Sequence, residues 1–309
     1  MKNIFKSWFL PAMAWVVLSI PTVVAQTPTD AIMMEKGQIC FAVLFTHDTW
    51  DEYWEGTLKR DNGNVGTLTR QTVMPMFALG ITNKINVIAA LPWVRTDASA
   101  GQVTGVSGLQ DWGIWLKGEP LNYQAGPGKF SLFAVAGLTG PTSNYLPDYA
   151  PLNLGLGCVE GSFRGILDYE LDKGMYARAF AGYHIRGNST IERDYYYTTH
   201  SVYSDEVDMP NAITYGASVG SWLLKNSFRI EAVFDGLKTL GGHDIRRQDV
   251  GFPSNRMIFT RIGGNLQYYF PFVKGLGVIA SGGYVLSGRN VGQSTILNAG
   301  VTYQFGIWK

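Results

Sequence analysis

The sequence predicts an all-β protein: a transmembrane antiparallel up-and-down β-barrel of twelve strands, preceded by a signal peptide. Three observations lead to this prediction. Apolar residues alternate with polar or small residues along most of the chain, the connections between the alternating segments are in turn short and long, and an apolar stretch precedes them all. A period of two places successive side chains on opposite faces of a strand, as the wall of a membrane barrel requires.

The N-terminal stretch has the features of a secretory signal peptide. Lys2 and Lys6 supply a positive start, the run from Trp8 to Ile20 is apolar and uncharged, and small or modest residues lead up to Ala25. This pattern is typical of a cleaved signal peptide, although a retained membrane helix is the alternative. We expect three regions: 1–25 as signal peptide, 26–37 as a periplasmic N-terminal segment or small plug, and 38–309 as the transmembrane β-barrel.

The composition of the 309 residues argues against several other classes of protein. Charged residues make up only 16% of the chain, and removing residues 1–25 leaves 23 basic beside 24 acidic residues. Nucleic-acid-binding proteins usually carry a basic excess, so we expect no such partner. Two cysteines, Cys40 and Cys158, are too few for a disulfide scaffold and are expected to be small buried apolar residues.

The alternation extends over twelve segments. In the last one a single face carries Leu297, Ala299, Val301, Tyr303, Phe305 and Ile307. A membrane-spanning strand needs about 9–11 residues, and most of the segments are at least that long. The predicted strands are 38–48, 67–81, 85–97, 108–120, 130–141, 153–170, 175–187, 212–223, 228–239, 256–270, 276–287 and 294–308.

The connections between these segments differ in length in a regular way. Short ones lie at 82–84, 122–129, 172–174, 225–227 and 271–275, and mostly longer polar ones at 49–66, 98–107, 142–152, 188–211, 240–255 and 288–293. Bacterial outer-membrane barrels have short periplasmic turns and longer external loops. An even number of strands then puts both chain ends on the periplasmic side.

A soluble β-sandwich is the alternative fold, because its strands alternate too. Its outer face would be charged, whereas the polar faces here carry mostly Gly, Ser, Thr and Asn with sparse charges. Aromatic residues such as Trp93, Trp112, Tyr183 and Tyr268 fall toward strand ends, where the two interfacial girdles of a membrane barrel lie.

Several short motifs occur in a particular order: Ala78-Leu79-Gly80-Ile81-Thr82-Asn83-Lys84, then Ala90-Leu91-Pro92-Trp93, then Ser107-Gly108-Leu109-Gln110-Asp111-Trp112-Gly113, then Ala136-Gly137-Leu138-Thr139-Gly140-Pro141-Thr142. This order resembles the outer-membrane barrel family named for the meta-pathway of phenol degradation, itself distantly similar to fatty-acid-type transporters of hydrophobic compounds. The resemblance covers mainly residues 78–142. Gln110 stands where the family usually has a glycine, and residues 139–142 permute the usual Pro-Thr-Gly. The resemblance implies a channel or transporter for small hydrophobic or aromatic solutes.

The faces opposite the apolar ones would fill the barrel, so their side chains are the candidate site. An interior lattice of ion pairs and a charge-lined path for solutes both remain open at this point. The charged or titratable candidates are Arg70, Asp111, Lys117, Glu119, Glu160, Arg164, Asp168, Arg178, His184, Arg229, Glu231, Asp235 and Arg261. The apolar candidates, which could form a pocket for a hydrophobic solute or simply interior packing, are Met74, Met76, Phe133, Met257 and Phe259.

We therefore expect an outer-membrane channel of a Gram-negative-type envelope. A closed structural barrel that acts through its external loops is the second hypothesis. A lipid hydrolase is the third, and it is disfavoured because His47, His184, His200 and His243 lie in no recognisable Ser/His signature. The expected partners are outer-membrane lipid, the barrel-assembly machinery and a small-molecule solute. We expect no catalysis, cofactor or metal site, and the acidic run 205–208 is interpreted as a solvated patch.

Overall fold

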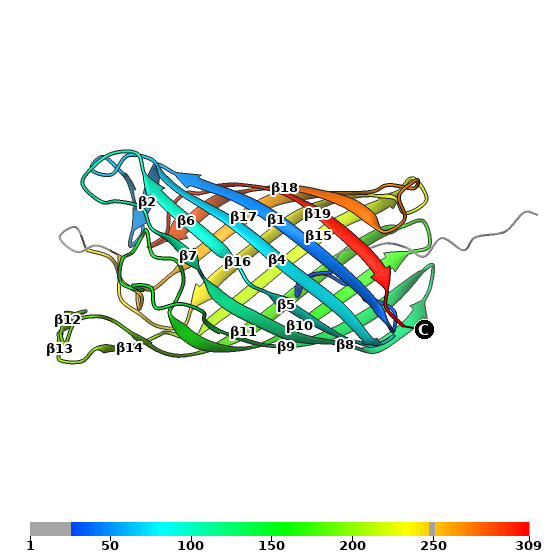
Figure 1. Ribbon diagram of the computed structural model, residues 1–309, viewed down its shortest axis with the longest axis horizontal. Coiled ribbons are helices and arrows are strands. Elements are labelled where there is room, and N and C mark those ends of the chain that lie inside the picture. The colour runs from blue at the N-terminus through cyan, green and yellow to red at the C-terminus, as the bar shows by residue number, and fades with distance from the viewer. Residues whose placement is uncertain (1–25, 247–250, 309) are drawn as a thin grey trace, which may run out of the picture.

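The structure, a computed structural model, describes residues 26–246 and 251–308 (Figure 1). The predicted signal peptide lies outside these residues. Within them, no helix is long and apolar enough to cross a membrane.

The chain forms a closed antiparallel barrel of twelve wall strands, as predicted. The barrel closes because β1 (Gln38–Trp50) pairs with β4 (Leu68–Thr82) on one side and with β19 (Thr295–Gly306) on the other. This closure excludes the two-sheet sandwich. The other wall strands are β5 (Ile85–Ala90) with β6 (Trp93–Ala98), β7 (Ser107–Leu109) with β8 (Asp111–Ala125), β9 (Gly128–Pro141), β10 (Cys158–Leu171), β11 (Met175–Thr190), β15 (Ala212–Leu223), β16 (Phe228–Thr239), β17 (Ile258–Tyr269) and β18 (Leu276–Arg289).

Two of the wall strands are interrupted in the middle. The third predicted strand breaks at Leu91-Pro92, between β5 and β6, and the fourth breaks at Gln110, between β7 and β8. Proline has no N–H to donate to a ladder, which explains the first break. The break is bridged locally, since the Gln110 N–H donates to the Pro92 carbonyl at 2.9 Å.

Two predicted boundaries were wrong. The turn expected at 122–129 is only Gly126-Pro127, because Gly126 adopts a φ of 62° and closes the hairpin tightly. The strand expected from residue 153 begins at Cys158. Leu152 and Leu154 mimic strand alternation, but they are buried (2% and 4% exposed) because this stretch folds into the mouth of the barrel.

Short strands in the connections mark one end of the barrel, which we call the long-loop end; the other is the short-turn end. Here β2 (Glu52–Glu55) pairs with β3 (Leu58–Asp61), β12 (Tyr196–Tyr197) pairs with β13 (Ser201–Val202), and β14 (Glu206–Asp208) extends the wall along β11. Figure 1 shows the β12–β13 hairpin projecting beyond the wall.

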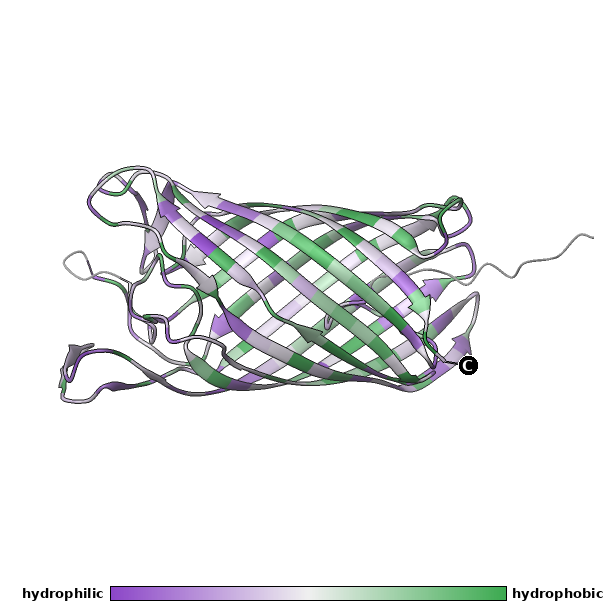
Figure 2. Cartoon of the chain, viewed as in Figure 1, coloured by the Kyte–Doolittle hydropathy of each residue, from purple (hydrophilic) through white to green (hydrophobic). Residues whose placement is uncertain are grey.

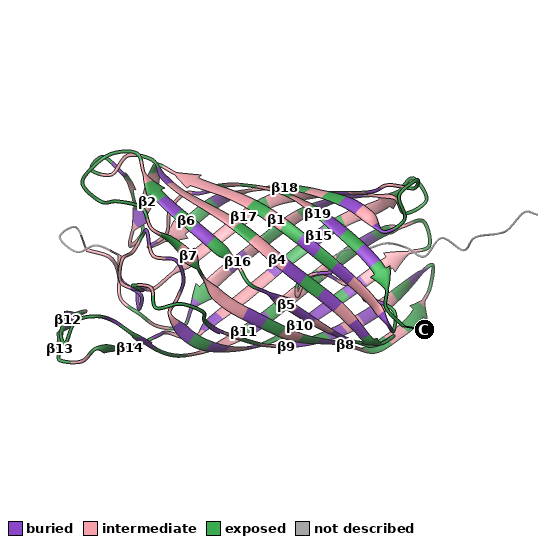
Figure 3. Cartoon of the chain, in the orientation of Figure 1, coloured by how far each residue is buried: buried purple, intermediate pink, exposed green. Residues whose placement is uncertain are grey.

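The outer face of the wall is apolar. On β1, Phe41, Val43 and Phe45 are exposed (47%, 39% and 43%), whereas the alternate residues Cys40 and Ala42 are buried. Figure 2 shows apolar residues alternating with more polar ones along the wall strands, and Figure 3 shows exposed and buried residues alternating along the same strands. Exposed apolar side chains that cover a closed sheet are expected where hydrocarbon is the solvent.

Inside the barrel, large side chains lie flat against glycines of the neighbouring strand. A Cβ on Gly216 would be 2.5 Å from Cε1 of Phe180, and one on Gly220 would be 2.6 Å from Cζ of Tyr176. The glycines are therefore required by close approach, and they keep this part of the wall thin.

Candidate solute path in the barrel lumen

The segment 26–37 lies inside the barrel. Lys117 on β8 donates from Nζ to Oδ1 of Asp30 at 2.7 Å and to the carbonyls of Asp30 and Thr27 at 2.7 and 3.2 Å. The Lys117 side chain is 0% exposed and that of Asp30 is 7% exposed. Burial raises the pKa of Asp30, but the charges of Lys117 and Arg178 and the hydrogen bonds from Lys117 and the Ile32 N–H together more than offset it, so the pKa lies below its ordinary value.

The same segment covers an apolar half of the inner wall. Ile32 and Met34 pack with inward residues of β1, β4 and β5, among them Ala42, Met76 and Ile88. Ala31 and Met33 pack against a second group, Phe133, Val135 and Ile166 on β9 and β10. These inward residues are therefore closed off from solvent by the segment.

The predicted apolar candidates fall into two groups: those that the segment 26–37 covers or borders, and those that lie away from it. Met76 and Phe133 are 6% and 2% exposed beneath the segment, and Met74 packs at its edge. Met257 and Phe259 lie on the other side of the barrel and are partly exposed, with the Arg261 guanidinium 5.9 Å from the Phe259 ring centre.

Toward the short-turn end the charged candidates form a buried ion-pair cluster. Arg178 contacts Asp168 and Glu231, both at 3.2 Å, and Arg229 contacts Glu231 at 3.2 Å. Arg229 also donates to the Tyr176 hydroxyl at 2.6 Å. None of the four charged side chains is more than 9% exposed, so the pairing offsets the cost of their desolvation.

The remaining charged candidates contact loops, turns or each other. Arg70 donates to the carbonyls of Asn153 and Leu154, and Asp111 accepts from Tyr145 and from the Leu156 N–H, which ties the connection 142–157 into the mouth of the barrel. Glu119 accepts from Asn122 near the short-turn end.

A second inner surface remains partly exposed, and we call it the open wall. It consists of inward residues on β1 and β16–β19: Thr46, Asp235, Arg261, Asn265, Ser281 and Asn298. Arg261 pairs with Asp235 at 2.7 Å while remaining 33% exposed, and Asn298 bridges Thr46 (2.5 Å) and Ser281 (2.9 Å). Nearer the short-turn end the inward residues become buried: Gln267, Tyr269, Thr302 and Gln304 are 9%, 5%, 1% and 8% exposed.

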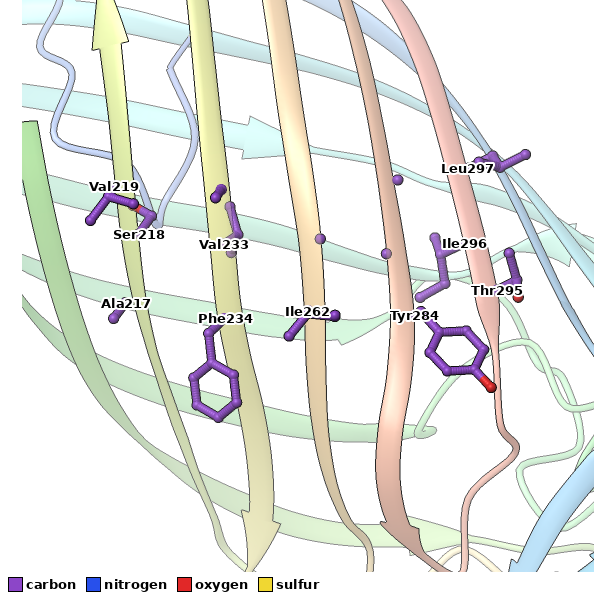
Figure 4. A pocket seen from close by; sticks show the side chains of 14 residues that line it. Ala217, Ser218, Val219, Val233, Phe234, Ile262, Tyr284, Thr295, Ile296 and Leu297 are labelled. Carbon is purple, nitrogen blue, oxygen red and sulfur yellow. The ribbon is translucent and has the colours of Figure 1, made fainter. Parts of the chain in front are cut away.

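The groove seen in Figure 4 lies on the opposite, outward face of these strands. It has a volume of about 750 Å³ and is bordered by Val219, Phe234, Ile262, Tyr284 and Leu297. All five side chains are exposed apolar residues of the outer surface. The groove is therefore separate from the lumen and suits hydrocarbon chains.

Sequence reasoning missed one hydrogen-bonded chain in the lumen. His184 contacts Oε1 of Glu160 through Nδ1 at 2.7 Å and Oγ1 of Thr214 through Nε2 at 3.0 Å. The order hydroxyl, imidazole, carboxylate is that of a nucleophile triad. However, Arg186 also holds Glu160 at 2.8 Å, and the backbone around Thr214 is engaged in two strand ladders, so no free amides face the hydroxyl as an oxyanion hole. Only the strand register, which brings these distant residues together, could have revealed the chain.

The other residues singled out from the sequence form no further cluster. Within residues 26–246 and 251–308, no three His, Cys, Asp or Glu side chains are grouped to hold a metal ion. Cys40 and Cys158 are free and buried, as predicted. His200 lies exposed in its loop beside Thr199.

The fold can now be compared with known proteins. No protein-family model and no curated protein matches the chain, so the resemblance to the phenol meta-pathway family is not confirmed. Among solved structures, the crystal structure of the COG4313 outer membrane channel from Pseudomonas putida F1 is similar over 91% of this chain and 100% of that one, with a TM-score of 0.72 and 16% identity. This chain therefore has the same barrel fold as that protein.

Two further structures are more distant. The NanC porin matches over 84% of this chain and 98% of its own, with a TM-score of 0.46 and 9% identity. The translocator domain of the autotransporter NalP from Neisseria meningitidis matches over 88% and 90%, with a TM-score of 0.43 and 11% identity.

Proposed function

We propose that this protein is a passive channel for small solutes in the outer membrane of a Gram-negative-type envelope. The observation that carries the proposal is the open wall: polar, partly exposed side chains line the inside of a closed barrel whose outside is apolar. A barrel of this kind is stable only with hydrocarbon outside and a wetter interior. Insertion would involve the barrel-assembly machinery, with the short-turn end in the periplasm.

The solutes are small because the interior is largely filled. Segment 26–37 acts as a plug on one side of the lumen, and the buried ion-pair cluster narrows the short-turn end. A solute path therefore follows the open wall. Support for a hydrophobic or aromatic solute comes from Phe259 and Leu237, which are partly exposed there, and not from Met76 or Phe133, which are covered.

Single-channel recording and liposome swelling on refolded protein test this proposal. Asn298→Trp places an indole in the lumen at the open wall and should at least halve the conductance. Leu297→Trp is the matched control, since the neighbouring side chain points outward and is 58% exposed, so conductance should be unchanged. Absence of conductance and of swelling with every solute would overturn the proposal.

A closed barrel that acts through its external loops is the second candidate. It is favoured by the aromatic pair at the base of the β12–β13 hairpin, where Tyr203 is 86% exposed and its ring centre lies 5.2 Å from that of Tyr195. Replacing residues 195–203 with a short Gly-Ser linker should then abolish partner binding in a barrel that remains folded, and retained binding would reject this function.

The hydrogen-bonded chain from Thr214 through His184 to Glu160 is the one observation in favour of a lipid hydrolase. Release of fatty acid from phospholipid that is lost in His184→Asn would support this function. No release by the wild-type protein would reject it.

A further inference from the structure

One row of side chains crosses the inner wall from β10 to β17. The register pairs Arg164 with Gly182, Gly182 with Thr214, Thr214 with Leu237, and Leu237 with Phe259. Arg164, Thr214, Leu237 and Phe259 are partly exposed, whereas Gly182 is buried. The row therefore presents a cation at one end, a hydroxyl near its centre and apolar surface at the other end.

Arg164 differs from the other cations of the inner wall. Lys117, Arg178, Arg229 and Arg261 each have a carboxylate within 4.0 Å, and both terminal nitrogens of Arg70 donate to loop carbonyls. Among the described residues Arg164 has no ion pair: Nη1 donates to the Pro28 carbonyl at 3.0 Å, and the guanidinium lies 5.6 Å from the Phe180 ring centre.

The nearest acid is already engaged. Oε1 of Glu160 is held by His184 at 2.7 Å and Oε2 by Arg186 at 2.8 Å. Arg164 is thus a partly exposed cation whose charge no carboxylate within residues 26–246 and 251–308 neutralises by contact. A guanidinium in this condition favours an anionic ligand, and a carboxylate matches its planar donors.

The surface beside Arg164 is low, because its neighbour in the row is Gly182. A Cβ on Gly182 would lie 2.8 Å from Oγ1 of Thr214 and 3.4 Å from Nε of Arg164, so these two side chains pack over the glycine and no larger residue fits there. Strands lie about 4.8 Å apart, which puts Leu237 roughly 14 Å from Arg164 along the row, and the arginine side chain spans part of that distance. A molecule that contacts both Arg164 and Leu237 therefore only needs to be small.

We propose that this row is a binding site for small monocarboxylates with an apolar or aromatic body, the carboxylate on Arg164 and the body against Phe180, Leu237 and Phe259. The proposal rests on the channel function and names the class of solute that the channel selects.

Equilibrium binding and flux test the site separately. Isothermal titration on the refolded protein in detergent uses benzoate, its neutral analogue benzamide and the cation benzylammonium. We expect binding of benzoate only, weakened at least tenfold in Arg164→Gln and partly restored in Arg164→Lys. Arg193→Gln is the matched control, because this loop arginine pairs with Asp148 and is 49% exposed, and it should bind like the wild type.

The flux arm uses liposomes loaded with the same solutes. The ratio of benzoate to benzamide flux should fall about tenfold in Arg164→Gln, and Phe259→Ala should reduce flux of benzoate more than flux of acetate. Heat-modifiable gel mobility verifies folding, and Arg164→Lys replaces Arg164→Gln if the latter does not fold. Equal binding of benzoate and benzamide, or unchanged benzoate binding in Arg164→Gln, overturns the site. Arg164-dependent binding without flux of any solute overturns the channel and leaves the site standing.

Discussion

Asp30→Ala should loosen the plug. This substitution leaves Lys117 inside the barrel at 0% exposure with only two carbonyl oxygens, those of Thr27 and Asp30, as acceptors. Removing one partner of a buried ion pair costs about 3–5 kcal/mol. That cost shifts the equilibrium between the docked and released segment by roughly two to nearly four orders of magnitude.

Apolar packing opposes this release. Ile32 and Met34 are 9% and 1% exposed in the docked segment. Full burial of such a side chain contributes about 1.5–3 kcal/mol, so the two together contribute about 3–6 kcal/mol. Because the two quantities are similar, Asp30→Ala should give a segment that exchanges between docked and released states, without complete displacement.

Single-channel recording distinguishes these states. Asp30→Ala should show frequent transitions to a larger conductance that are rare in the wild type. Adding Lys117→Met removes the unpaired charge and should suppress them, since a neutral buried pair is close to isoenergetic with an ion pair. Asp148→Ala, which breaks a loop ion pair with the partly exposed Arg193, is the control and should leave the recording unchanged. The reasoning is refuted if Asp30→Ala conducts like the wild type, or if the double variant opens as often as the single one.

Three further outcomes are expected. A hydrogen bond from Arg289 lowers the pKa of Asp244 from 3.8 to about 2. The contact therefore stabilises the folded loop fully above pH 3.8, and this stabilisation is lost as pH falls through about 2. Protection of the loop from protease should follow the same pH range, and it should be reduced at neutral pH in Asp244→Asn. Gly137→Val should destabilise the folded barrel by about 1–3 kcal/mol, because its Cβ would lie 2.2 Å from the Trp115 ring. Gly161→Ala, with nothing within 4 Å of its Cβ, should leave the stability unchanged. Heat-modifiable gel mobility compares the two variants. Leu116→Arg, on an outward side chain 52% exposed, should cost about 2–4 kcal/mol of folding free energy in lipid vesicles.

The strands could be predicted because their signal is local. On β19, Leu297, Val301 and Phe305 alternate with Asn298 and the other inward residues, and the bilayer selects that alternation directly. The same local signal caused the wrong strand start near Leu152 and Leu154. Alternation indicates that one side of a segment is buried, but it does not indicate which part of the protein buries that side. There the cover is the mouth of the barrel, and the residues belong to a connection.

The contacts of the candidate site could not be predicted in the same way. The residues that hold Arg178 on β11 come from two other strands: Asp168 from the neighbouring β10 and Glu231 from β16, which lies beyond β15. Only register and depth in the barrel bring them together. The sequence indicated that these side chains point inward, but not which of them are neutralised. Arg164 is inconspicuous in the sequence because the feature that sets it apart is the lack of a partner, which depends on every neighbour.

The two halves of the inner wall explain why the plug lies where it does. Inward residues of the first strands, such as Ala42, Ala78 and Ile88, are apolar and would expose hydrophobic surface to water in an empty lumen. Ile32 and Met34 bury that surface, whereas Asn298 and the rest of the open wall can remain hydrated. A segment with apolar residues at these positions is stabilised only where it packs against the apolar inward residues of the first strands. The side on which solutes can pass therefore follows from which strands carry apolar residues inward, and a polar residue at Ile88 would remove the preference that keeps the plug off the open wall.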